Sequence, residues 1–366
     1  MKHIKTLFTG LALILAGTLH AQDSITERTG SNRPFSMSGY IETYYSYDFN
    51  KPASNTKPGF LYSYNRHNEF NLNLGFVKGS YNTDRVRANL AIGSGTYMNA
   101  NYAAEPGTLK NIFEANAGYK LSPTKNWWLD IGIMPSHLGF ESAIGKDNWT
   151  LTRSIVAENS PYFESGAKLS YTSDDGTLTV AGLALNGWQR ITRVDGNSLL
   201  SYGTQVFYKP SSKLTLNYST FIGTDKPDNA RLWRTYHDLY GIFQFNGTVG
   251  LILGLDIGTE QKAPKSDDTN SWYSPVGILR LTPSEKWAFV LRGEYYSDRN
   301  GVIVATGTPN GFKTSGASIN VDYVPVMNTA LRLEIRTFNS KDRVFTKRNG
   351  ASDANTAISF STAISL

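Results

Sequence analysis

Apolar and polar residues alternate along several long stretches of this chain, and this alternation limits the folds that it can adopt. At 249–257 nearly every second residue is aliphatic, and the residues between them include Gly250, Gly254 and Asp256. A period of two is that of a β-strand, whose successive side chains point to opposite faces. The same pattern recurs at 214–222, 331–336 and 357–366.

Short polar turns recur at a mean spacing of about 41 residues, from 81–84 to 324–328. Between consecutive short turns lies one longer irregular stretch rich in Asn, Asp, Gly and Pro. The segments between connections are ten to fifteen residues long, whereas strands of soluble proteins usually have about 5–6 residues. Sixteen segments fit between residues 36 and 366, and an even count places both chain ends on the short-turn side.

A strand of a soluble β-sandwich, with one face exposed to solvent, would alternate in the same way. A second observation is therefore needed to distinguish a sandwich from a membrane barrel. Aromatic residues cluster near the segment ends, as they do at the two lipid–water boundaries of a membrane barrel. They are Tyr44, Tyr45, Tyr47, Phe70, Phe76, Trp127, Trp128, Tyr171, Tyr208, Trp272, Tyr273, Trp287, Tyr295, Tyr296 and Tyr323. Their positions favour an apolar parity that faces lipid.

Arginines fix which parity faces inward. A slip of one residue would turn Arg332 and Arg336 toward lipid, at a cost of roughly 2–4 kcal/mol each at the midplane. Backbone groups in hydrocarbon must also be paired, so the sheet has to close on itself. The sequence therefore predicts an all-β, transmembrane, up-and-down antiparallel β-barrel of about 16 strands. An eight-bladed propeller has a similar period but needs four short strands in each repeat.

Two segments depart from the alternation. In 176–188 and 286–294, Leu183, Leu185 and Val290 occupy the otherwise polar parity, together with Ala288. We interpret these segments as walls beside a loop that folds inward.

Residues 1–21 have a basic start, a short apolar run and small residues before Gln22, which is typical of a cleaved signal peptide. An N-terminal anchor helix is the alternative. We expect 22–36 to be a short periplasmic segment and 37–366 to form the barrel in the outer membrane of a Gram-negative bacterium. The absence of cysteine excludes a disulfide scaffold. The 36 basic and 30 acidic residues are scattered, which does not favour nucleic-acid binding.

Sixteen strands leave room for an aqueous channel. The predicted pore-lining residues are Glu42, Arg85, Arg87, Asp130, Arg280, Arg292, Glu294, Arg332, Glu334 and Arg336. The same inward parity also includes Glu69, Glu114, Glu164, Lys168, Asp256 and Asp322. With these residues the signs nearly balance, so no strong ion preference follows. They could orient hydrated solutes in a transverse field, or they could pair across the wall and stabilise it.

The longest loop, 139–161, exceeds what a tight hairpin needs, and such loops are usually functional or mobile. If it folds into the lumen, it narrows the bore with Lys146, Asp147, Trp149, Arg153 and Glu158. If it folds outward, these side chains form a solvated surface.

The chain resembles the outer-membrane β-barrel porin-2, OmpL-like family. The resemblance rests on GYIETYYSYDFN (39–50), NEFNLNLGFVKGSY (68–81), LDIGIMPSHLGFESAIGKDNWTLTRS (129–154) and ENSPYFESGAKLSY (158–171). It implies an outer-membrane pore whose substrate is undefined. One departure is the last residue, because such barrels often end in Phe or Trp and this chain ends in Leu366.

Catalytic and metal-binding patterns are absent from the sequence. His67, His137 and His237 stand alone in or near loops, and Ser136 beside His137 forms no triad pattern. We therefore expect no enzyme, no cofactor and no metal site, with an outer-membrane hydrolase as a remote alternative. The favoured function is a porin-like channel for passive diffusion of small hydrophilic solutes. The main alternative is a barrel with an occluded lumen that binds surface ligands through loops 50–66 and 139–161.

The expected partners follow from the membrane location and the pore. They are outer-membrane lipid and lipopolysaccharide, the barrel-assembly machinery and small hydrophilic solutes, without nucleic acid. The sequence leaves a homo-oligomer open.

Overall fold

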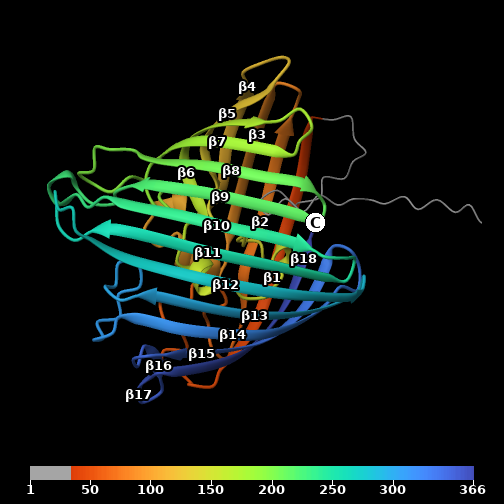
Figure 1. The fold of residues 1–366 in the computed structure, drawn as a ribbon. Coiled ribbons are helices and arrows are strands. Elements are labelled where there is room, and N and C mark those ends of the chain that lie inside the picture. The colour runs from red at the N-terminus through yellow and green to blue at the C-terminus, as the bar shows by residue number, and fades with distance from the viewer. Residues whose placement is uncertain (1–33) are drawn as a thin grey trace, which may run out of the picture.

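The computed structural model describes residues 34–366, in which sixteen antiparallel strands close into a barrel (Figure 1). The barrel strands are β1 (Phe35–Asp48), β2 (Phe70–Asn82), β3 (Val86–Ser94), β4 (Ile112–Lys120), β5 (Asn126–Pro135), β6 (Phe163–Thr172), β7 (Leu178–Leu185), β8 (Ser201–Ser211), β9 (Leu214–Gly223), β10 (Arg234–Gln244), β11 (Val249–Gln261), β12 (Thr269–Ser284), β13 (Trp287–Asp298), β14 (Phe312–Tyr323), β15 (Thr329–Ser340) and β18 (Ala354–Ser365). The fold predicted from the alternation is confirmed.

Every barrel strand pairs with its neighbours in the chain, and β1 pairs with β18 to close the sheet. That seam runs from Tyr40 opposite Ser365 to Asp48 opposite Ala357. Closure satisfies the backbone groups that a sheet edge would leave unpaired in hydrocarbon. Long loops gather at one end of the barrel and short turns at the other (Figure 1).

The loops contain the remaining elements. These are the strands β16 (Phe345–Lys347) and β17 (Gly350–Ser352), the helices α1 (Thr96–Asn101) and α2 (Ile155–Glu158), and the 3-10 helices Gly107–Asn111, Gly145–Asp147 and Asp228–Ala230. None of the described helices is long and apolar enough to cross a membrane. Strand β1 begins at Phe35, two residues before the predicted start of the barrel. The predicted signal peptide, 1–21, lies outside the described residues, as does most of 22–36.

The apolar residues of the alternating pattern face outward on the barrel wall. Leu253 and Ile319, each in the middle of its strand, are 50% and 61% exposed. The opposite parity faces inward, and Glu42, Arg332 and Glu334 are buried there. This is the predicted register, because arginine and glutamate cannot face hydrocarbon without a large cost.

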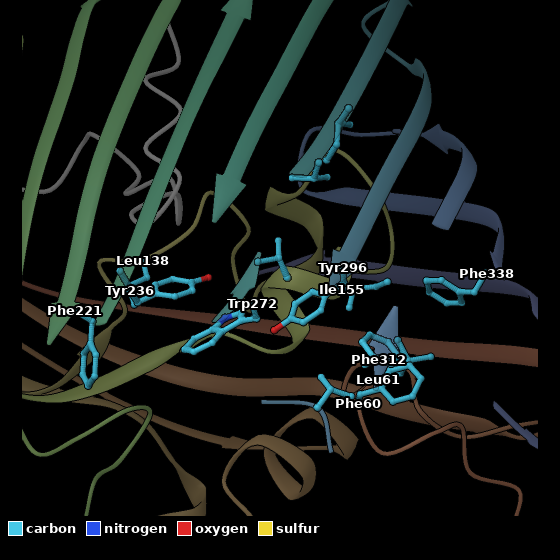
Figure 2. Packing of buried hydrophobic residues seen from close by; sticks show 14 of the residues in the cluster. Phe60, Leu61, Leu138, Ile155, Phe221, Tyr236, Trp272, Tyr296, Phe312 and Phe338 are labelled. Atoms are coloured by element: carbon cyan, nitrogen blue, oxygen red, sulfur yellow. The ribbon is translucent and has the colours of Figure 1, made fainter. Parts of the chain in front are cut away.

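The aromatic prediction is only partly correct. Tyr45, Phe70 and Trp127 are on the outer wall, but Tyr44, Phe76, Trp272 and Tyr296 point inward and are buried. Their positions near strand ends matched those expected at a lipid boundary. The residues instead pack against loops that enter the barrel, and Trp272, Tyr236 and Tyr296 lie around Ile155 (Figure 2).

The inward-facing aliphatic residues belong to the same interior cluster. Leu183, Leu185 and Val290 are buried with Ile155 and Val156 of the 136–162 loop. These departures from the alternation therefore mark the wall against which a loop packs. At about 25 cal/mol per Å² of buried apolar surface, such contacts favour the inward loop position.

Glycines in β11 let the loop approach the wall. A Cβ atom at Gly254 would lie 2.9 Å from the Phe140 ring, and one at Gly250 would lie 2.7 Å from the Trp149 ring. Both distances are shorter than a normal carbon–carbon contact. The two glycines therefore form shallow gaps that receive two aromatic side chains of the loop.

Replacing Leu253 by arginine tests the lipid-facing register. We expect Leu253→Arg to destabilise the barrel by about 2–4 kcal/mol, because the side chain lies near the middle of the lipid-facing wall. The measurement is denaturant unfolding in lipid bilayers. Phe207→Arg is the matched control, since Phe207 faces inward and is half-buried. Equal destabilisation by both variants would contradict the register.

Candidate functional site

The loop 136–162 leaves the long-loop end of β5 and enters the barrel. Residues 151–160 are all buried, including Arg153, which has no exposed surface. Helix α2 begins after Ser154, whose hydroxyl oxygen accepts a hydrogen bond from the backbone N–H of Ala157. This is a standard N-cap, and it defines where the loop turns back toward β6.

A histidine fixes the start of the loop. Nδ1 of His137 lies 2.9 Å from the carboxylate of Glu164 on β6, and Nε2 donates to the carbonyl oxygen of Thr220 on β9 at 2.8 Å. Both ring nitrogens therefore face acceptors, as an imidazolium requires. The backbone N–H of Gly139 then donates to Asp238 on β10 at 3.0 Å.

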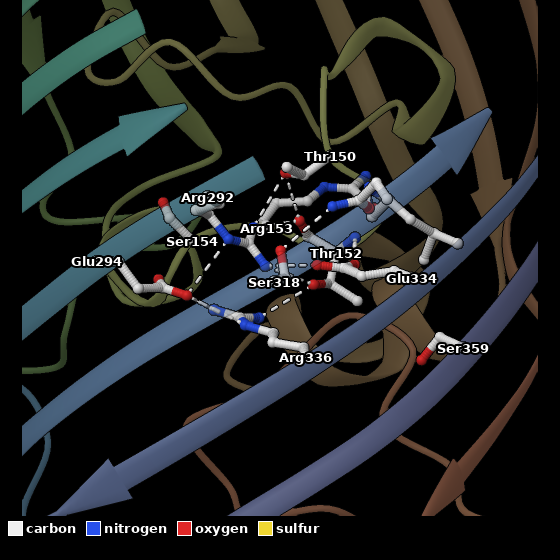
Figure 3. A network of polar contacts seen from close by, with 12 residues as sticks. Thr150, Thr152, Arg153, Ser154, Arg292, Glu294, Ser318, Glu334, Arg336 and Ser359 are labelled. Atoms are coloured by element: carbon white, nitrogen blue, oxygen red, sulfur yellow. Dashed lines mark hydrogen bonds and ion pairs between the residues drawn. The ribbon is translucent and has the colours of Figure 1, made fainter. Parts of the chain in front are cut away.

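Four charged residues on β13 and β15 hold the middle of the loop. Arg292 pairs with Glu334 at 2.7 Å, and Arg336 pairs with Glu294 at 2.6 Å. Arg292, Glu334 and Arg336 also bind Thr152 (Figure 3), and Glu294 accepts a hydrogen bond from the backbone N–H of Ile155 at 2.6 Å. Glu334 accepts from the backbone N–H of Thr152, and Arg292 donates to its carbonyl oxygen, each at 2.6 Å.

Arg332 extends this arrangement toward the short-turn end. Its guanidinium pairs with Asp322 at 2.9 Å and donates to the carbonyl oxygens of Gly145, Asn148 and Trp149. The buried charges are thus paired with one another and also satisfied by loop backbone, which is what burial of charge requires. These charged residues, predicted from the sequence to line the pore, anchor the loop.

A second loop, 49–69, meets the first one inside the barrel. The carboxylate of Glu158 accepts hydrogen bonds from the backbone N–H groups of Tyr62 and Ser63. Tyr64 accepts from Arg153 at 2.7 Å and donates to Glu42 at 2.8 Å. The predicted pore-lining Glu42 and the loop residues Arg153 and Glu158 therefore lie in one buried network.

A cavity of about 20 Å³ lies between the two loops, near Lys57, Glu158 and Arg336. That volume holds about one water molecule. Burial lowers the pKa of Lys57 to about 8, although neighbouring carboxylates such as Asp48 oppose the shift. At this level the two loops therefore leave very little free space.

Solvent reaches the inner wall on the short-turn side of the loop. Lys146 and Trp149 of the loop are half-buried, as are Arg87, Lys168 and Arg280 on the wall. Arg280 stacks over the Trp149 ring, with its guanidinium carbon 5.7 Å from the ring centre. Asp130 is buried and binds Arg87. Asp147, in the 3-10 helix Gly145–Asp147, is half-buried.

Arg85 is not a pore-lining residue, contrary to the prediction. It lies in the short turn between β2 and β3, and its guanidinium donates to the hydroxyl of Tyr119, which faces outward. The alternation around Arg85 and Arg87 gave both the same parity. The strand begins only at Val86, however, so parity does not apply to Arg85.

Sequence reasoning missed several residues that hold the loop. Thr152 and Tyr64 make central contacts, and Asn320 accepts from the backbone N–H of Leu151 at 2.9 Å. No motif marks them, because each contact joins residues far apart in the chain. Among residues 34–366, no cluster of three or more His, Cys, Asp or Glu side chains could hold a metal ion.

Removing Arg292 should release the loop. We expect Arg292→Met to cost about 3–5 kcal/mol in unfolding free energy, because Glu334 would be left as a buried charge without its ion-pair partner. Unfolding and limited proteolysis at 139–161 measure the effect. The control is Arg231→Gln, which removes an exposed pair with Asp228 and should change neither readout. An unchanged loop in Arg292→Met would refute the anchoring role.

The His137 contact should make stability depend on pH. Burial alone lowers the pKa of His137, but Glu164, the Thr220 carbonyl and Asp238 outweigh it and hold the pKa above 6.5. The contribution is therefore complete below the unfolded pKa and is lost as the pH rises through the folded pKa. We expect the thermal midpoint to fall as the pH rises above 6.5 through the raised pKa of His137, and His137→Gln to remove that fall.

His237 provides the matched control for this experiment. It is exposed on the outer side of β10, where it contacts the hydroxyl of Tyr218 at 2.8 Å. His237→Gln should leave the pH dependence intact. A fall that persists unchanged in His137→Gln would show that another group is responsible.

Comparison with known structures shows the same architecture. The barrel is similar to an anion-selective porin from Comamonas acidovorans, at 11% identity and a TM-score of 0.58, covering 91% of this chain and 99% of that one. It is similar to the outer-membrane channel DcaP of Acinetobacter baumannii, at 11% identity and a TM-score of 0.57, covering 91% and 97%. The trimer form of OmpT from Vibrio cholerae matches at 8% identity and a TM-score of 0.59, covering 91% and 99%.

No curated protein matches the chain in sequence. A family model described as "Putative beta-barrel porin-2, OmpL-like" matches residues 34–366, which is the whole barrel. The family resemblance predicted from the sequence is confirmed, and the molecule is a porin-like outer-membrane β-barrel. The chain belongs to the beta-barrel porin-2, OmpL-like family.

Proposed function

We propose that this barrel is a channel for passive diffusion of small hydrophilic solutes across the outer membrane of a Gram-negative bacterium. The observation that carries the proposal is a closed sixteen-stranded wall with a polar inner face and one long loop anchored inside it. Barrels of this strand number enclose aqueous channels. The names of the similar structures, a porin and an outer-membrane channel, agree with this function.

The anchored loop sets the size limit. The loops 49–69 and 136–162 fill much of the long-loop half, and the cavity between them is only about 20 Å³. Passage therefore runs along the edge of the loops and suits small solutes only. Arg153 and Glu158, predicted as constriction residues, hold the two loops together, whereas Lys146 and Trp149 are half-buried on the loop.

One observation favours the second candidate, a barrel with an occluded lumen. Residues 151–160 are all buried, and an apolar cluster around Ile155 packs against the inner wall. Surface binding through loops 50–66 and 139–161 has less support, since Phe60 and Leu61 of the first loop are buried. Outer-membrane lipid, lipopolysaccharide and the barrel-assembly machinery remain proposed partners, as does a homo-oligomer.

Planar-bilayer recordings distinguish the two candidates. We expect small stepwise currents from the refolded wild-type protein and larger steps from Arg292→Met, in which the loop loses its anchor. Compact migration of unheated samples on a gel confirms that each barrel is closed, and Arg231→Gln controls for the substitution. Closed barrels that carry no current, both in the wild type and in Arg292→Met, would contradict the channel and favour the occluded barrel.

A further inference from the structure

We propose that the short-turn half of the lumen is an anion-attracting vestibule, formed by cationic side chains that make no ion pair with a carboxylate. The selectivity that it gives to transport rests on the proposed channel function. The vestibule does not depend on the channel function, because it is formed by charged side chains of the wall on one side of the anchored loop. The solutes that it would concentrate are small anions, such as halides, phosphate and short carboxylates.

The wall acids of this region are already neutralised. Glu114 pairs with Lys78 at 2.8 Å, and Asp322 pairs with Arg332 at 2.9 Å. The third acid, Asp130, binds Arg87 through both carboxylate oxygens. Bidentate pairs of this kind are among the strongest side-chain contacts. Each of these carboxylates already has a closer cationic partner, although Asp130 lies opposite Lys168 in the ladder and Asp322 also attracts Arg280.

Four further cations have no such partner among the described residues. Lys168 faces the lumen and Lys120 lies at its short-turn mouth, at the end of β4. Both are half-buried, and neither has an acid within ion-pair distance. Arg280 stacks on Trp149, and its buried Nε atom makes no hydrogen bond. The ammonium group of Lys146 donates to the hydroxyl of Ser365, at 3.1 Å, and not to a carboxylate.

Other acids do not cancel this excess. Asp147, beside Lys146 on the loop, is one acid against four cations. Asp238 and Asp256 are 1% and 5% exposed, and they are hydrogen-bonded to the Gly139 N–H and the Tyr236 hydroxyl. Glu164 is buried against His137. At the mouth, the short turns carry both signs, with Asp174 paired to Lys125.

The cations surround the lumen instead of forming a patch on one wall. Lys120 is on β4 and Arg280 is on β12, which are opposite each other in the closed sheet. Lys168 and Arg280 each lie five residues before the short turn that follows their strand. Lys146 projects from the loop toward the seam between β1 and β18.

Such a ring favours anions for two reasons. A cleft of one sign with low-dielectric walls focuses the field and raises the local concentration of counter-ions. Rings of Arg and Lys are the lining that selects anions in pores. Lys168 and Arg280 have half-buried side chains that retain access to water, so a passing anion can exchange its hydration for their N–H donors.

Reversal potentials measure the selectivity. In a potassium chloride gradient across a planar bilayer, we expect the wild-type channel to pass chloride more readily than potassium. The reversal potential should therefore have the same sign as the chloride equilibrium potential. The double variant K168Q/R280Q should lower the chloride-to-potassium permeability ratio severalfold, which moves the reversal potential toward zero. Lys265→Glu, in the exposed loop between β11 and β12, is the control and should leave it unchanged. Open channels that prefer potassium, or a double variant with wild-type selectivity, would overturn the proposal.

Fluorescence quenching tests the vestibule without any current. Trp128 lies under the Arg87 guanidinium and Trp149 lies under that of Arg280, so both report on ions in this region. In detergent-refolded protein, iodide should quench the pair more strongly than caesium does, and K168Q/R280Q should reduce the iodide effect. The variant W128F/W149F supplies the background from the other tryptophans.

The two experiments separate the proposals. If the barrel carries no current but iodide quenches preferentially, the channel function is refuted and the vestibule is supported. If the barrel conducts but iodide and caesium quench equally, the vestibule is refuted and the channel function is supported.

Discussion

The pairing of backbone groups in hydrocarbon is the constraint from which the rest of this molecule follows. No water is available in the membrane core to bond a free N–H or C=O group, so the strands must form a sheet without edges. Here that requirement is met by β1 and β18, whose seam joins residues near the two ends of the described chain. Once the sheet is closed, every strand has one face toward lipid and one toward the interior.

Closure creates an interior too wide for wall side chains to fill, and two loops occupy part of it. Their backbone groups also need partners inside the barrel, where water is scarce. The charged side chains of β13 and β15 provide them, since Arg292 and Glu334 bind both each other and Thr152. A buried ion pair contributes little net stability on its own. Its additional bonds to the loop define one position for the loop.

The wall could be predicted from the sequence because its rule is local. Parity and turn spacing gave the strand number and the face of Leu253, and the exceptions at Leu183 and Val290 indicated an internal loop. Parity fails where the strand stops, as at Arg85. It also cannot distinguish an aromatic side chain at the lipid boundary from one packed beneath a loop, as at Trp272. The contacts of Thr152, Tyr64 and Glu164 join distant segments and have no local signal.

The distance along the chain between the loop and its anchors has a consequence for biogenesis. Thr152 is 182 residues from Glu334, and Ile155 is 139 residues from Glu294. The loop therefore emerges from translation long before the strands that bind it, and contacts of such separation form late. Until β13 and β15 have joined the sheet, the loop lacks its contacts to Glu294 and Glu334 and has only partners such as Glu164 and Tyr64. The final position of the loop is thus set only in the last steps of maturation.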